Sequence, residues 1–287
     1  MWIIYSLLTA FSLATSDALT KRSLVSRDEY FVAWTRLLFA LPVFVPILFF
    51  IEIPSLDRTF WLATLCALPL EIAALILYTK ALKVSPISLT MPFLALTPLF
   101  LIIMAYIIVG ETVSIYGGIG IMLVVLGSYT LNLHKMKYDL LEPVKAIFRE
   151  KGSVMIILVA FIFSITASLG KVAIDHSSPI FFGSFYFILI TILFTPIAMV
   201  KNRGGLKISK KDILPLSSIG VTFALMIIFH MLAMSLVNVA YMISIKRTSL
   251  LFSILYGHLL FKEEKIAEKA LGAIIMLLGF VLIVISK

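Results

Sequence analysis

Five ionisable residues lie within apolar stretches of this sequence, where a charge needs a chemical reason. They are Asp17, Arg36, Glu71, Lys246 and Arg247. A charge at the centre of a bilayer costs about 2.5–3.5 kcal/mol or more, so such residues face protein or a water-filled cavity and mark functional sites. These five residues are the first candidates for the chemistry of the chain.

The adjacent cations Lys246 and Arg247 are the strongest candidates for a binding site. An apolar run over 239–261 predicts one helix, and at 1.5 Å rise per residue the pair would lie about 5–6 Å from its midpoint. Arginine presents a planar fork and lysine a point charge, and both suit a phosphate, sulfonate or carboxylate. The alternative is a salt bridge with Glu71 alone, but one carboxylate cannot neutralise two cations. We therefore expect the pair to bind the acidic group of a substrate.

Glu71 lies near the middle of an apolar run over 59–81, two residues after Pro69. Carboxyl groups at such depth serve in proton relays and in binding cationic groups. The alternative is a structural carboxyl that pairs with a base or bonds to a kinked backbone. Glu71 is the proton-coupling candidate and also a substrate-binding candidate.

Other polar side chains accompany these charges. Tyr78 and His230 could hydrogen-bond a substrate, although a satisfied place in the core is an equal alternative. Thr248 is a weaker binding candidate, because threonine often bonds only its own helix. Asp17 and Arg36 are expected to form a structural ion pair or to extend towards the membrane surface.

Motifs of membrane enzymes are absent from the sequence. It contains no His-Glu-x-x-His, no Gly-x-Ser-x-Gly and no glycine-rich phosphate loop. The one cysteine, Cys66, has no nearby His or Cys, so we expect no disulfide, metal or cofactor. A lipid-modifying membrane enzyme is the alternative from another class of protein.

The composition requires a membrane. Of 287 residues, 61% are hydrophobic and 14% charged, with a mean hydropathy of +1.11, whereas a soluble domain carries about 25% charged residues. A helical span needs roughly 20 apolar residues, which predicts an all-α membrane protein with ten transmembrane helices. The expected helices are 2–21, 30–51, 59–81, 86–109, 113–133, 153–174, 179–200, 212–237, 239–261 and 266–285.

The loop charges predict the orientation. When the ten helices alternate across the membrane, one side carries only Arg58, Lys171 and Lys287, and the other collects all remaining loop lysines and arginines. The positive-inside rule puts the basic side in the cytoplasm and both termini outside. We therefore attribute the net charge of +9 to the orientation of the helices in a prokaryotic inner membrane, and we expect no nucleic-acid partner. We expect Lys21 and Lys171 to anchor their helices at the membrane interface. A gating role is the alternative.

The two halves of the chain share landmarks at nearly constant spacing. Residues 1–135 and 152–287 look like two copies of one five-helix unit, and because five is odd the second copy is inverted in the membrane. Residues 136–151 form the cytoplasmic linker, either a short amphipathic helix or a polar connection. The matched pairs are Lys21/Lys171 and Pro46/Pro196 at 150 positions, and Glu111/Glu263, Gly120/Gly272 and Gly127/Gly279 at 152.

The four glycines Gly120, Gly127, Gly272 and Gly279 lie seven residues apart within each pair, so each pair shares one helix face. Small residues on one face let helices approach closely in lipid. We expect them to pack the fifth helix on the tenth, or to pack two copies in a homodimer.

These features together resemble the drug/metabolite transporter superfamily, EamA-like branch. The residues that carry the resemblance, besides the repeat, are Lys21, Arg36, Ala81-Leu82, Pro98, Gly110-Glu111 and Lys262-Glu263. The resemblance implies an inverted-repeat fold with a central cavity lined largely by helices three, four, eight and nine.

The Lys246-Arg247 pair also resembles the triose-phosphate and nucleotide-sugar transporter branch, in which such a pair holds the substrate phosphate. The chain departs from that branch at Thr90-Met91-Pro92, which offers no lysine. The resulting expectation is a secondary active transporter that moves a small anionic or zwitterionic metabolite by alternating access, through exchange or proton coupling. The alternative is a broad exporter of amino acids or amphipathic cations, with Glu71 binding the cation.

Overall fold

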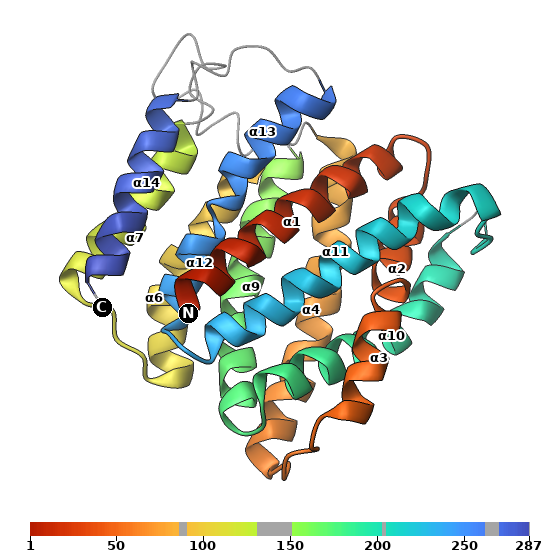
Figure 1. Cartoon of the computed structure of the whole chain (residues 1–287), viewed down its shortest axis with the longest axis horizontal. Helices are drawn as coiled ribbons and strands as arrows, with labels where there is room; N and C mark the ends of the chain where they lie inside the picture. The colour runs from red at the N-terminus through yellow and green to blue at the C-terminus, as the bar shows by residue number, and fades with distance from the viewer. Residues whose placement is uncertain (86–90, 131–150, 203–204, 262–269, 287) are drawn as a thin grey trace.

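The computed structural model describes residues 1–85, 91–130, 151–202, 205–261 and 270–286, and these form helices with no strand. Figure 1 shows long helices packed side by side at inclined angles. The helices are α1 (Trp2–Leu24), α2 (Glu29–Leu38), α3 (Leu41–Phe50), α4 (Arg58–Val84), the 3-10 helix η1 (Met91–Leu96), α6 (Thr97–Val109), α7 (Ile115–Thr130), α9 (Lys151–Asp175), α10 (Pro179–Lys201), α11 (Lys210–Met234), α12 (Val239–Lys246), α13 (Ser249–Phe261) and α14 (Ala270–Ile285).

Length and hydropathy make this an integral, multi-pass membrane protein. Within the described residues, six segments are long and apolar enough to cross a bilayer. Shorter apolar helices occupy Phe93–Val109, Ile115–Thr130 and Leu271–Ile285. Large apolar side chains such as Phe50, Ile107 and Leu214 point outward and are mostly exposed, as a lipid-facing surface requires. The six segments are Trp2–Leu24, Glu29–Phe50, Arg58–Val84, Lys151–Asp175, Pro179–Lys201 and Lys210–Met234.

The second expected helix, 30–51, is not continuous but is divided into α2 and α3. Pro42 has no N–H to bond the Leu38 carbonyl and is accommodated in the first turn of α3. Gly220 of α11 lies against this break. A Cβ there would overlap the Phe39 carbonyl carbon, so only glycine allows so close an approach.

The expected ninth helix, 239–261, is also broken, here between α12 and α13. The backbone N–H of Thr248 donates to the Ile245 carbonyl at 2.9 Å, and the Thr248 hydroxyl donates to the same carbonyl at 2.8 Å. Such bonding by a threonine hydroxyl competes with regular helical hydrogen bonds. The chain therefore turns tightly at Arg247, with no proline to cause it.

The fourth expected helix, 86–109, begins its described part as a 3-10 helix. Residues 91–96 form η1, and α6 follows with Pro98 in its first turn. Prolines explain the irregular start, since each removes a backbone donor. Residues 136–150 of the expected linker, Thr90, Lys262 and Glu263 lie outside the described residues, whereas Lys151, the last residue of the expected linker, begins α9. The helix expected in the linker is therefore not addressed.

The two halves pack against each other through matching pairs of helices. Helix α1 lies along α11, and α4 lies along α9 (Figure 1). The Nζ of Lys21 donates to the Leu82 carbonyl at 2.7 Å, and the Nζ of Lys171 donates to the Met234 carbonyl at 3.0 Å. Leu82 and Met234 are 152 positions apart, so one interaction occurs at equivalent places in both halves.

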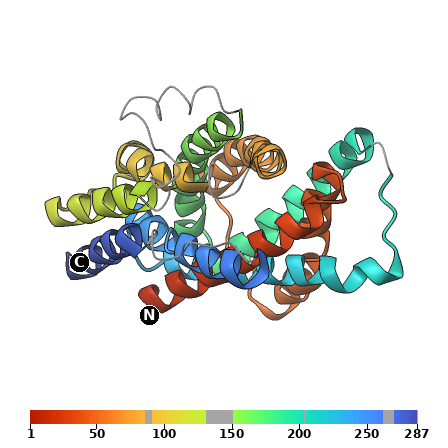
Figure 2. The ribbon, with the colours of Figure 1, turned by 90° about the horizontal axis from the view of Figure 1, so that it is seen from above.

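Helices α7 and α14 pack on one another through the four glycines. A Cβ on Gly120 would lie 2.9 Å from the Gly279 carbonyl oxygen, and one on Gly127 would lie 2.7 Å from the Gly272 carbonyl oxygen. The pairing of 120 with 279 and of 127 with 272 makes the two helices antiparallel. Figure 2 shows this pair, yellow-green and dark blue, together at one end of the molecule.

Candidate functional site

A cavity of about 130 Å³ lies inside the bundle. A water molecule needs roughly 10–15 Å³ of such space, so the cavity has room for a small solute. Residues from α1, α2, α9 and α10 line it as well as those from α4, α6, α11 and α12, which is a wider set of helices than the resemblance implied. Its polar lining residues are Arg36, Glu71, Tyr78, Thr97, Thr166, Tyr186, His230, Lys246 and Arg247.

Lys246 and Arg247 reach the cavity from the break between α12 and α13. Arg247 is only 3% exposed, and its Nη2 donates to the Thr97 Oγ1 at 2.8 Å. Its Nε is buried and has no hydrogen-bond partner. The Nζ of Lys246 lies 3.5 Å from the Nδ1 of His230. The tight turn thus presents both cations to one space.

The salt bridge with Glu71 is not formed in this structure. Over the described ranges, no ion pair within 4.0 Å joins a carboxylate to Lys246 or Arg247. Glu71 lines the same cavity, as does Thr166 of α9. An isolated cation in a low-dielectric interior is costly, so the basic pair is left able to accept an anion.

Asp17, Arg36 and Tyr78 form one connected group. The Nη1 of Arg36 donates to the Asp17 Oδ1 at 3.2 Å, and the Tyr78 hydroxyl donates to the Asp17 Oδ2 at 2.7 Å. The guanidinium of Arg36 also lies 4.3 Å from the centre of the Phe223 ring. Arg36 is 5% exposed and lines the cavity, so the expectation that it could extend to the membrane surface is wrong.

Thr248 is not among the residues that line the cavity. Its hydroxyl bonds the Ile245 carbonyl instead, so its placement corrects the expectation of a binding role. Sequence reasoning missed Thr97, Thr166 and Tyr186, which do line it. Tyr186 stands 150 positions after Arg36, the same offset as Lys21 and Lys171, and this equivalence was the signal available for finding it.

Glu111 connects the first half of the chain to the helix that carries Lys246. It lies between α6 and α7, and its Oε2 accepts a hydrogen bond from the Val239 N–H at 2.8 Å, at the start of α12. The Nδ2 of Asn238 donates to the Thr112 carbonyl at 2.9 Å. A carboxylate at a helix N-terminus is favourable, but partial burial raises the pKa of Glu111 above its ordinary value.

This raised pKa predicts how Glu111 affects stability with pH. The folded protein holds the proton more tightly than the unfolded chain, so the contribution is complete below the unfolded pKa and is lost as pH rises through the folded pKa. The melting temperature of the wild type minus that of Glu111→Gln is therefore expected to fall as the pH rises above 4.5, the ordinary pKa of a glutamate. Thermal unfolding in detergent measures it, with the exposed acid Glu52→Gln as control. A difference that rises with pH would contradict this account.

A bundle of apolar helices around a buried cavity with charged lining is the architecture of a membrane transporter. A model of the EamA-like transporter family matches residues 1–133 and 150–285 of this chain. The chain belongs to the EamA-like transporter family, and it is a membrane transporter of the drug/metabolite superfamily.

Comparison with other proteins adds the fold alone. A search of curated protein sequences finds no match. A solved structure described only as "Crystal structure of protein" is similar to this chain with a TM-score of 0.75 and 11% sequence identity, and the match covers 99% of each chain. At that identity the likeness shows a shared fold.

Proposed function

We propose that this chain is a secondary active transporter that moves a small anionic or zwitterionic metabolite by alternating access. The acidic group of the solute binds Lys246 and Arg247. One observation carries the proposal: Arg247 is buried on a cavity, its Nε has no partner, and no carboxylate of the described chain lies within 4.0 Å. A buried guanidinium left open in this way favours an incoming oxyanion.

The proposed architecture is a ten-helix inverted 5+5 repeat. The equivalent hydrogen bonds of Lys21 and Lys171 support it, as does the packing of α1 on α11 and of α4 on α9. Two related halves of opposite orientation can exchange conformations, which turns an outward-open site into an inward-open one. The excess of basic residues on one set of loops favours a prokaryotic inner membrane with both termini outside.

Glu71 is the proposed coupling carboxyl. It lines the cavity and forms no contact ion pair with the described bases. A carboxyl without a fixed cationic partner can exchange a proton with the cavity during the transport cycle. The other role is a counter-ion that approaches Lys246 and Arg247 when the site is empty, which would favour exchange of one solute for another.

Flux into proteoliposomes tests the proposal. The wild type is expected to carry small organic anions in preference to cations, and to respond to an imposed pH gradient. Glu71→Gln should remove the response to the gradient, because the amide cannot carry a proton, while anion binding remains. Glu52→Gln, which alters an exposed acid outside the helices, is the matched control.

Two results would count against it. A Glu71→Gln protein that still responds fully to the pH gradient would show that coupling does not pass through Glu71, and the counter-ion role would replace it. Preference for cations in the wild type would overturn the anion assignment and favour the exporter of amphipathic cations.

A further inference from the structure

We propose that the transported solute is an organic monoanion with an apolar body, and that the Tyr186 hydroxyl selects its single polar substituent. This inference rests on the proposed function, since it concerns the same cavity. Three independent properties of the cavity lining support it: the balance of charges, the apolar wall and the small number of hydroxyl groups without a hydrogen-bond partner.

The charge balance favours one negative charge on the solute. Arg36 is matched by Asp17 at 3.2 Å. Among the other acidic and basic residues of the lining, Lys246 and Arg247 carry two formal positive charges and Glu71 one formal negative charge, which leaves one positive charge in excess. Uncompensated charge in a buried site is unfavourable, so a monoanion completes the site. A phosphate monoester with two charges would exceed it.

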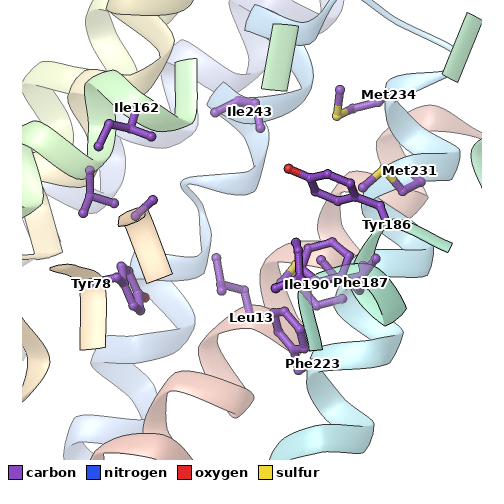
Figure 3. Close-up of a cluster of buried hydrophobic side chains, with 14 of the residues drawn as sticks. Leu13, Tyr78, Ile162, Tyr186, Phe187, Ile190, Phe223, Met231, Met234 and Ile243 are labelled. Carbon is purple, nitrogen blue, oxygen red and sulfur yellow. The ribbon is translucent and has the colours of Figure 1, made fainter. Parts of the chain in front are cut away.

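Much of the remaining lining of the cavity is apolar and aromatic. Figure 3 shows Phe187, Ile190, Phe223, Met231 and Met234 gathered on α10 and α11, and all five line the cavity. Burial of apolar surface stabilises a complex by about 25 cal/mol per Å². The hydroxyl groups of a sugar placed against such a wall would lose water without gaining partners, which is costly.

Other hydroxyls on the cavity already have partners. The Tyr78 hydroxyl donates to the Asp17 carboxylate, and the Thr97 hydroxyl donates to the Leu94 carbonyl at 2.7 Å.

Tyr186 differs from these residues. It is 4% exposed, and its hydroxyl is the one hydroxyl among the described lining residues that is buried without a hydrogen-bond partner. In Figure 3 this hydroxyl points away from α10 into the space that Leu13 and Ile243 also border. A single free hydroxyl matches one polar substituent and does not match a polyol.

Binding to the detergent-purified full chain tests this, by calorimetry with defined probes. They are 3-phenylpropanoate, its three ring-hydroxylated isomers, glycerol 3-phosphate and L-phenylalanine. We expect 3-phenylpropanoate to bind at least ten-fold more tightly than the last two. Tyr186→Phe should weaken the best hydroxylated isomer by about 2- to 12-fold, the worth of one hydrogen bond, and leave 3-phenylpropanoate unchanged. Tyr116→Phe alters a tyrosine that is 66% exposed and serves as control.

Each of the following results would contradict one part of the proposal. If glycerol 3-phosphate or L-phenylalanine binds as tightly as 3-phenylpropanoate, the apolar monoanion is wrong while the anion site stands. If Tyr186→Phe leaves every hydroxylated isomer unaffected, Tyr186 does not select the substituent. If no anion binds, or if both Lys246→Ala and Arg247→Ala leave every affinity unchanged, the proposed function itself fails. Because Tyr186→Phe keeps the ring and breaks no hydrogen bond, loss of the fold does not complicate the result.

Discussion

Arg247→Ala is expected to weaken the binding of small organic anions by about 10- to 150-fold, the worth of a hydrogen bond to a charged group in a buried site. Lys246→Ala should weaken it as well. Arg247 offers a free Nε and the planar fork that suits an oxyanion, and Lys246 adds a second positive charge beside it. Calorimetric titration of the purified protein measures both losses.

The structure also predicts that the Arg247 variant folds. The guanidinium bonds only the Thr97 hydroxyl among the described residues, and Thr97 keeps its own bond to the Leu94 carbonyl when the arginine is removed. Arg27→Ala removes a cation of the loop region whose partner is Asp212, so it should leave the affinity unchanged. Unaltered affinity in both Lys246→Ala and Arg247→Ala would exclude the basic pair as the anion site.

Gly127→Ala is expected to destabilise the protein strongly. The added Cβ would lie 2.6 Å from the Met276 backbone nitrogen and 2.7 Å from the Gly272 carbonyl oxygen, so α7 and α14 must move apart. Overpacking of this kind costs about 1–3 kcal/mol. For a chain of this size that lowers the melting temperature by about 2–12 °C, which thermal unfolding in detergent measures.

Gly118→Ala is the matched control on the same helix. A Cβ there meets nothing within 4 Å, and alanine is the better helix former by about 1 kcal/mol, so this variant should be equal or slightly more stable. If Gly127→Ala proved as stable as Gly118→Ala, the close contact between α7 and α14 would not hold the two halves together.

Hydropathy predicted an all-helical membrane protein, and over the described residues most of the expected helices lie within a few residues of the observed ones. This succeeds because a bilayer requires long apolar runs with internally bonded backbones. The family match over 1–133 and 150–285 confirms the EamA-like resemblance. Helix breaks were predicted less well. Proline marks the start of α3, but the turn at Arg247 contains no proline, and the Thr248 hydroxyl bonds the Ile245 carbonyl there.

The sequence by itself determined which ionisable groups are buried, because a charge in an apolar run has no route to water. It determined the basic pair and the central acid as candidates in this way. Only the tertiary structure decided their partners. Arg36 bonds Asp17, Arg247 bonds Thr97, and Glu71 forms no ion pair with a base of the described residues.

Those partners lie as many as 150 positions apart in the chain. Hydropathy and spacing predict which residues share one helix. The hydrogen-bonding partner of a side chain depends on which helix faces pack together. Tyr186 shows the same dependence. In the sequence it is one more aromatic residue of an apolar helix. Only the position of α10 beside the cavity shows that its hydroxyl is buried without a partner.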